Sequence, residues 1–115
     1  MIYYRRYIGD YRRDTATLSH IDHGTYALLM DEYYAQDGAL PRHISELNEL
    51  CRARTKSGKD SVMRIAQRFF PCDDNGVRHN KRADIEIKIA LAAIEKMRLA
   101  GIKSGRKRVV LWKHV

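Results

Sequence analysis

The chain has 115 residues, a net charge of +8 and a hydrophobic content of 44%. This length fits one domain with a modest core, and the seven Tyr residues argue against disorder. No apolar run approaches the roughly 18 residues of a membrane span, and the N-terminus lacks the apolar region of a signal peptide. We therefore expect a cytoplasmic protein of a bacterial cell, with no membrane partner and with Cys51 and Cys72 reduced.

The positive charge is concentrated in the second half of the chain. Residues 1–50 contain five Lys and Arg against eight Asp and Glu, a net charge of −3. Residues 51–115 contain seventeen against six, a net charge of +11. A polyanionic partner would therefore contact the second half.

The first seventeen residues alternate Tyr with pairs of Arg, as in Tyr3-Tyr4-Arg5-Arg6-Tyr7 and Tyr11-Arg12-Arg13. This pattern fits a short strand or an extended arm, and periodicity does not choose between them. Arg with Tyr could grip phosphate and stack on bases. We favour the alternative, in which the Tyr rings pack on the core beneath the Arg stems.

The strongest helix of the first half covers residues 18–34. Ser19 is a good N-cap, and the negative charge of Asp22 suits the first turn of a helix. The apolar stripe is wide enough for a helix that packs on two sides. Gly24 is unfavourable inside a helix, which predicts that another backbone passes close to it.

Shorter elements follow this helix. Residues 36–38 predict a turn, and residues 39–41 fit a short strand that pairs with a later hairpin. The spacing of Ile44, Leu47, Leu50 and Cys51 predicts a short amphipathic helix. After a break at residues 55–58, a third helix is expected from about Lys59 to Phe70, with its apolar side inward.

A β-hairpin is predicted directly after the third helix. Residues 68–72 and 77–82 read as strands around Asn75-Gly76, two residues that tolerate positive φ. Two helices joined by a brief turn and followed by a hairpin form the helix-turn-helix and wing of a winged helix. The predicted fold is therefore mainly α and winged-helix-like.

The remaining chain predicts one long helix and a tail. Two apolar stripes run from about Lys81 to Leu99, either to fill a groove in the core or to form a homodimer seam. Gly101 is expected to end this helix. We divide the chain into a domain over residues 1–102 and a basic C-terminal tail over residues 103–115.

Several short motifs resemble one known family. They are, in order, Leu18-Ser19, Asp22-His23-Gly24, Tyr26, Leu28-Leu29, Tyr33-Tyr34, Leu40-Pro41, Phe69-Phe70, His79-Asn80-x-Arg82 and Ala100-Gly101-x-x-Ser104-Gly105-x-x-Arg108. Their order and spacing resemble the YdaU-like domain of phages and prophages, a domain of unknown function often found at the front of replication initiator-like proteins. The family usually has Glu at the position of Asp22. The resemblance implies a winged-helix-like, DNA-associated domain and supplies no catalytic residue.

The expected DNA-binding residues are cations and one amide on the third helix, the wing, the start of the last helix and the tail. They are Lys56, Lys59, Arg64, Gln67, Arg68, Arg78, Lys81, Lys103, Arg106, Lys107 and Arg108. Arg64 is the first choice for base contact, because an arginine can contact guanine through two hydrogen bonds. In the alternative, Arg64 and Arg68 only pair with Glu46 and Glu49 of the preceding helix.

Enzymatic and metal chemistry are not expected. No pair of Cys or His residues has the spacing of a structural zinc site, and Asp73-Asp74 is better explained as turn chemistry. There is no Gly-rich phosphate loop, and no nucleophile is paired with a base. We expect neither a cofactor nor a metal.

Three functions remain open. The first is a nucleic-acid-binding winged helix of a phage or prophage, which binds duplex DNA in replication initiation or transcription control and associates with the nucleoid. The second is an adaptor that binds a host replication protein, such as a helicase or its loader, with DNA binding secondary. The third is a structural or inhibitory phage protein whose charge is incidental.

Overall fold

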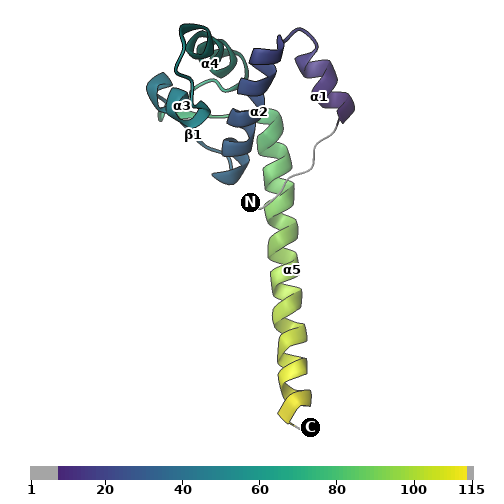
Figure 1. The fold of residues 1–115 in the computed structure, drawn as a ribbon. Helices are drawn as coiled ribbons and strands as arrows, with labels where there is room; N and C mark the ends of the chain where they lie inside the picture. Colours follow the sequence, from purple (N-terminus) through teal and green to yellow (C-terminus); the bar gives the residue numbers. More distant parts are fainter. Residues whose placement is uncertain (1–7, 114–115) are drawn as a thin grey trace.

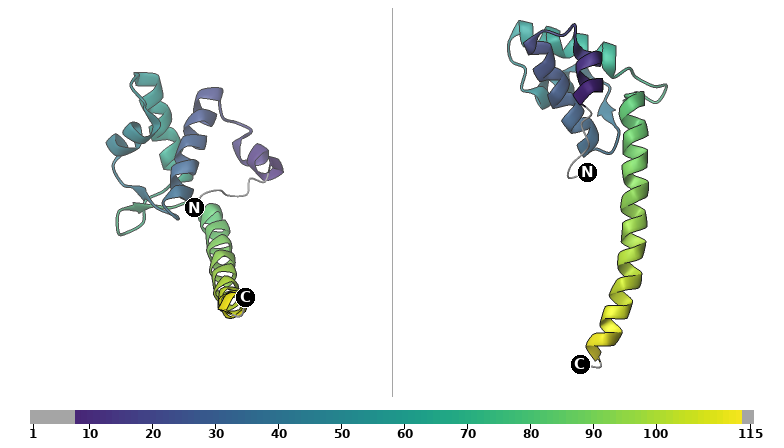
Figure 2. Two further views of the ribbon diagram at one scale, coloured as in Figure 1. Left: turned by 60° about the horizontal axis from the view of Figure 1, so that its bottom comes forward. Right: turned by 90° about the vertical axis from the view of Figure 1, so that its right-hand side faces the viewer.

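In the computed structural model, the backbone is described for residues 8–113, and side chains are described for residue 9, residues 11–102 and no others. The structure is mainly helical and has one small antiparallel sheet (Figure 1). The elements are α1 (Ile8–Thr15), α2 (His20–Ala35), β1 (Leu40–Pro41), α3 (Ile44–Cys51), α4 (Lys56–Phe69), β2 (Val77–Arg78) and α5 (Lys81–Lys113). Figure 2 shows a compact body from which α5 projects. None of the described helices is long and apolar enough to span a membrane.

Helix α2 is the centre of the body, as its sequence predicts. The Ser19 side chain accepts a hydrogen bond from the backbone N–H of Asp22 and caps the helix. Leu29 and Tyr33 are fully buried, and α3 and α4 both pack against this helix. The prediction for Gly24 is wrong, because a Cβ atom at this position would have no atom within 4 Å. Gly24 is exposed, so no backbone passes close to it.

Helices α3 and α4 are joined by a short turn. Helix α3 ends at Cys51, and the next residue, Arg52, caps it with a left-handed φ of 55°. Thr55 then caps α4 by accepting a hydrogen bond from the backbone N–H of Gly58. Helix α4 therefore begins at Lys56, three residues before the predicted start. Its inward side is as predicted, with Ile65 buried in the core.

The sheet joins two parts of the chain that are far apart in the sequence. Leu40 pairs with Arg78 and Pro41 with Val77, which confirms that residues 39–41 pair with the later hairpin. The hairpin is shorter than predicted, because its first strand is reduced to a single bridge between Cys72 and Arg78. At its turn the Asp73 carboxylate accepts hydrogen bonds from the backbone N–H groups of residues 75 and 77.

Helix α5 is anchored to the body by a polar cluster. The Asn80 side chain accepts a hydrogen bond from the N–H of Ala83 and donates one to the Phe69 carbonyl. The Tyr33 hydroxyl accepts from the N–H of Asn80 and donates to Asp84. Burial raises the pKa of Tyr33, and the hydrogen bond to Asp84 adds to this shift. Tyr33 therefore stays protonated and serves as a donor at neutral pH.

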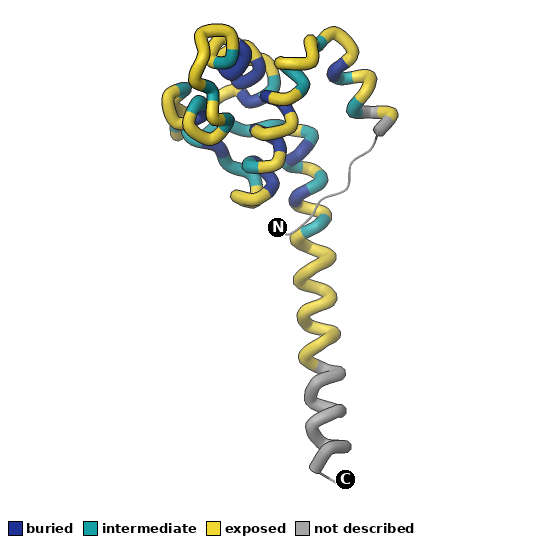
Figure 3. Tube along the Cα trace, viewed as in Figure 1, coloured by how far each residue is buried: buried dark blue, intermediate teal, exposed yellow. Residues whose placement is uncertain are grey.

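Beyond this anchor, α5 leaves the body. Ala83 and Ile87 are buried, whereas every residue from 91 to 102 is exposed (Figure 3). The prediction that Gly101 ends the helix is wrong, since the helical backbone continues to Lys113. The division into residues 1–102 and a tail over residues 103–115 stays a prediction. The side chains of that tail lie outside the described residues.

Helix α1 is a correction to the strand or extended arm expected for residues 1–17. It rests on the body through Tyr11, whose ring lies 5.6 Å from that of Tyr26. An ion pair between Asp14 and Arg82 connects the end of α1 to α5. Packing of Tyr11 on the core agrees with the favoured alternative. The arginine and tyrosine pattern over residues 3–7 lies outside the described residues.

Candidate nucleic-acid interface

The exposed side of α4 contains five of the eleven predicted DNA-binding residues. Ser61, Val62, Ile65 and Ala66 face the core. The exposed residues of the helix include a set of predicted ones, namely Lys56, Lys59, Arg64, Gln67 and Arg68. With Asp60 as its only acid, α4 has a net charge of +3, whereas α3 carries Glu46 and Glu49 and no base. A polyanion is therefore attracted to α4 and repelled by α3.

Arg64 is held by an acid from the start of α2. Its Nη2 atom donates to Oδ1 of Asp22 at 2.9 Å, and this hydrogen bond holds the pKa of the Asp22 carboxyl below its usual value. The alternative prediction, in which Arg64 pairs with Glu46 or Glu49, is therefore wrong, because the acid that binds Arg64 is Asp22. The Arg64 side chain is 58% exposed. Its Nε and Nη1 groups have no acceptor among the described residues, so they can donate to a ligand.

A buried chain of hydroxyl groups lies behind this ion pair. The Ser61 hydroxyl donates to Oδ1 of Asp22 at 2.6 Å and lies 2.7 Å from the Thr25 hydroxyl. Because Ser61 has one hydroxyl proton and uses it on the carboxylate, Thr25 donates to Ser61. This chain fixes Asp22, and through it Arg64, relative to the two helices.

Arg68 and Gln67 lie one turn further along α4. The Arg68 Nη1 atom donates to the Thr17 hydroxyl at 3.1 Å, and its guanidinium lies 4.8 Å from the centre of the Phe69 ring. Together with Arg64, Arg68 and Gln67 line a shallow hollow of about 430 Å³ between α4 and the start of α2. Three of the predicted residues are thus brought together around one concave surface.

Sequence reasoning missed two cations in the turn before α4. Arg52 and Arg54 are both exposed, and they directly precede Lys56 and Lys59. The signal was present as a run of four cations without an acid over residues 52–59. These four side chains extend the cationic surface of α4 around its first turn.

The remaining predicted DNA-binding residues lie away from this surface or have side chains outside the described residues. Arg78 donates from Nε and Nη2 to the Arg42 carbonyl and from Nη1 to the Phe70 carbonyl, at 2.9 to 3.0 Å. It thereby joins β1 to the end of α4, and its contact with phosphate stays a prediction. Lys81 is exposed at the start of α5. The side chains of Lys103, Arg106, Lys107 and Arg108 lie outside the described residues.

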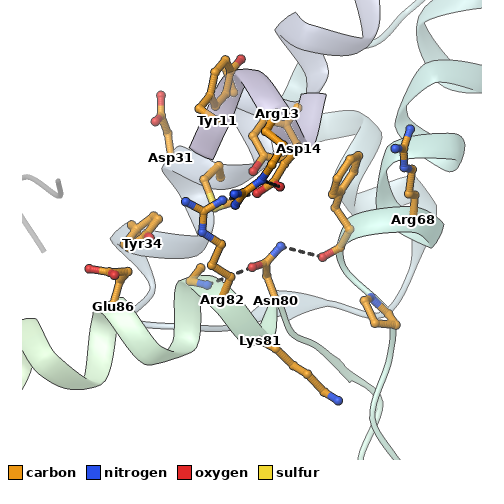
Figure 4. Close-up of a pocket in the computed structure, with 16 residues that line it drawn as sticks. Tyr11, Arg13, Asp14, Asp31, Tyr34, Arg68, Asn80, Lys81, Arg82 and Glu86 are labelled. Carbon is orange, nitrogen blue, oxygen red and sulfur yellow. Dashed lines mark hydrogen bonds and ion pairs between the residues drawn. The ribbon is translucent and has the colours of Figure 1, made fainter. Parts of the chain in front are cut away.

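A second concave surface lies between α1, α2, the end of α4 and the start of α5 (Figure 4). This groove has a volume of about 680 Å³. Tyr26 and Phe69 form an aromatic part of its lining, and Asp14 and Arg82 connect its two sides. Burial raises the pKa of Tyr26 to about 12, so its hydroxyl is neutral at physiological pH.

Two observations on the described residues concern metal binding and the reactivity of Cys51. Among them, no group of three or more His, Cys, Asp or Glu side chains could hold a metal ion. Burial raises the pKa of the Cys51 thiol to about 11, so it is a weak nucleophile at neutral pH. His79 contacts Asp73 and Tyr33 in the cluster at the start of α5, where it supports the turn.

A model of a protein family matches most of the chain. The family described as "Protein of unknown function (DUF1376)" matches residues 2–88, which include α1 to α4 and the anchored start of α5. No curated protein and no solved structure matches the chain. The projecting part of α5 lies beyond the matched residues.

Proposed function

We propose that this chain, which belongs to the DUF1376 family, is a winged-helix-like protein that binds duplex DNA through α4. The observation that carries the proposal is the cationic exposed side of α4, continued by Arg52 and Arg54 in the turn before it. The first half of α4 would enter the major groove, where a helix can reach base edges. The surrounding cations would contact phosphates.

The order of the elements supports the winged-helix part of the proposal. A first helix (α2), a short strand (β1) and a helix pair (α3 and α4) are followed by the Cys72 bridge and β2, which pairs back to β1. In this reading α4 is the recognition helix and the turn over residues 73–76 is the tip of the wing. Because Asp73 and Asp74 make this tip acidic, we assign phosphate contact to α4 and its preceding turn.

Salt dependence of DNA binding tests the proposal. With about five phosphate contacts, the logarithm of affinity should fall with the logarithm of salt concentration with a slope near −4.5, about 500-fold between 50 and 200 mM. Fluorescence anisotropy with a labelled duplex of mixed sequence measures this slope. A flat salt dependence, or no binding at 50 mM salt, would refute the proposal.

Paired variants then locate the surface. Lys56→Ala/Lys59→Ala should reduce the magnitude of the slope by about 1.8, because two phosphate contacts are lost. Arg98→Ala removes an exposed cation from the projecting part of α5 and should leave the slope unchanged. If Arg98→Ala changed the slope by about half as much as the double variant, each lost cation would count equally, and the protein would bind DNA only by its overall charge.

A second candidate function is that of an adaptor for a host replication protein, with DNA binding secondary. The observation that favours it is the groove between α1, α2, α4 and α5, since a concave surface that combines aromatic residues with charged ones suits a peptide segment. Substituting Ala27, which lines the groove, with Glu should abolish capture of a replicative helicase or loader and leave DNA binding intact. Unchanged capture of both host proteins by Ala27→Glu would contradict the adaptor function for this groove.

The cellular setting is part of the same proposal. A role in replication initiation or transcription control of a phage or prophage, in the cytoplasm and at the nucleoid, follows from the resemblance and from DNA binding together. A second copy of the chain is the remaining proposed partner.

A further inference from the structure

The exposed part of α5 has an apolar face that the body does not cover. Ile85, Ile89, Ala92, Lys96 and Leu99 follow each other at alternating spacings of four and three residues, which places them on one side of a helix. We call this the outer face of α5. Ile85 is 62% exposed, Ile89 60% and Leu99 50%.

The body packs against the opposite side of α5. Ala83 and Ile87 are 2% and 4% exposed, and Ile94 continues their side of the helix beyond the body. Because Ile87 lies about half a helical turn from both Ile85 and Ile89, the outer face points away from the body. A second helix can therefore lie along it without displacing the core.

We propose that the outer face of α5 binds the same face of a second copy of this chain, with the two helices antiparallel. The charges beside the face are self-complementary in this arrangement. Lys88 and Glu95 lie seven residues apart along one side of it. When Ile89 packs against Ala92 of the second copy, each Lys88 lies beside Glu95 of the other, so a two-fold axis produces the pair twice.

The charges disfavour a parallel pair. A parallel arrangement would place Lys96 directly against Lys96 of the second copy, within the seam. It would also align residues 96–113, which carry seven cations and no acid, with their own copy. With Ile89 against Ala92, the antiparallel arrangement instead places Lys96 against Ile85 of the second copy, and within residues 81–100 no cation lies level with another cation.

The length of the seam sets the strength of the dimer. Residues 85–99 provide two heptads, fewer than the three to four of a stable coiled coil. The seam therefore predicts a reversible dimer whose population rises with protein concentration.

The Glu95 carboxylate can bind Lys88 of the second copy although it already binds Arg98. Its Oε1 and Oε2 atoms accept hydrogen bonds from Arg98 at 2.7 and 3.0 Å and keep lone pairs for a second cation.

Sedimentation equilibrium of the full chain over a range of concentrations tests the surface. Wild type should show a monomer–dimer equilibrium, and Ile89→Asp should weaken it at least about tenfold by placing an unpaired charge in the seam. Ile94→Asp is the matched control, because Ile94 is 52% exposed on the opposite side of the same helix. It should leave the dimer intact. A monomer at every concentration, or a loss of dimer with Ile94→Asp alone, overturns the proposal.

A charge exchange tests the orientation. Lys88→Glu and Glu95→Lys should each weaken the dimer, and the double variant should restore it, because only antiparallel helices bring these two residues together. Arg98→Ala breaks the same pair within the helix that Glu95→Lys breaks, and it should leave the dimer unchanged. Circular dichroism of each variant monitors the helix. Failure of the double variant to restore the dimer, with helix content intact, overturns the antiparallel arrangement.

Discussion

Replacing Ser61 by Ala should destabilise the protein more than any change of an exposed hydroxyl. Ser61 is fully buried, and its hydroxyl joins the Thr25 hydroxyl of α2 to the Asp22 carboxylate. The substitution removes a charge-assisted hydrogen bond and leaves the Thr25 hydroxyl, 7% exposed, without this acceptor. The free energy of unfolding should fall by about 2–3 kcal/mol, which lowers the melting temperature by roughly 10 °C or more.

Urea unfolding followed by circular dichroism measures this loss as a shift in midpoint at constant m-value. Ser57→Ala, at an exposed position in the first turn of the same helix, is the matched control and should change the free energy by less than about 0.5 kcal/mol. The double variant Ser61→Ala/Thr25→Val should cost less than the two single changes added together, since it removes both hydroxyls. A loss below about 0.5 kcal/mol for Ser61→Ala, or strict additivity, would refute the hydrogen-bonded chain.

Three further results are expected. Arg64→Ala should weaken binding to the best DNA site by about 5- to 150-fold and relax the sequence preference at one base pair. Asp22→Asn should lower thermal stability but leave that sequence preference in place. If both variants lost the preference equally, as measured on selected DNA pools, Arg64 would be a structural residue. At pH 8 the Cys51 thiol, with its pKa near 11, should hold roughly 100-fold less thiolate than a thiol with a pKa of 9.0. Iodoacetamide should therefore label Cys51 slowly, as followed by mass spectrometry. Rapid labelling would contradict its burial. Hydrogen bonds from the backbone N–H groups of Val77 and Asn75 lower the pKa of Asp73 from 3.8. The stabilising effect of the Asp73 carboxylate is therefore complete above pH 3.8 and is lost as pH falls through the lower pKa of the folded state. Asp73→Asn should remove this loss of stability from urea titrations between about pH 5 and pH 2.5.

The helices of the body could be predicted because their signals are local. Ser19 and the apolar stripe mark α2 within one stretch of sequence, and the spacing of Ile44, Leu47 and Cys51 marks α3 in the same way. Even the pairing of β1 was accessible, since Leu40-Pro41 is a short apolar segment with a hairpin further on.

The errors arise where distant residues determine the structure. Helix α1 has a polar, Tyr- and Arg-rich sequence, and it is held by Tyr26 and Arg82. The acid that binds Arg64 is 42 residues away, whereas the wrongly chosen Glu46 and Glu49 were near in sequence. Gly101 resembles a helix end, yet the structure continues the helix through it. In the candidate interface, the sequence pattern of the third helix predicted the cations of α4, but Arg52 and Arg54 precede that helix and were overlooked.

The attachment of α5 at its first turn makes this helix a lever. Its 33 residues extend for roughly 50 Å, and the contacts described between it and the body are made by residues near its start, among them Asn80 and Asp84. A tilt of about 10° at this attachment would displace the far end by roughly 9 Å. The Asn80 side chain donates to the carbonyl of Phe69, the last residue of α4, so a displacement of α4 acts directly on the anchored start of α5. Small movements at one end of the molecule are thereby amplified at the other.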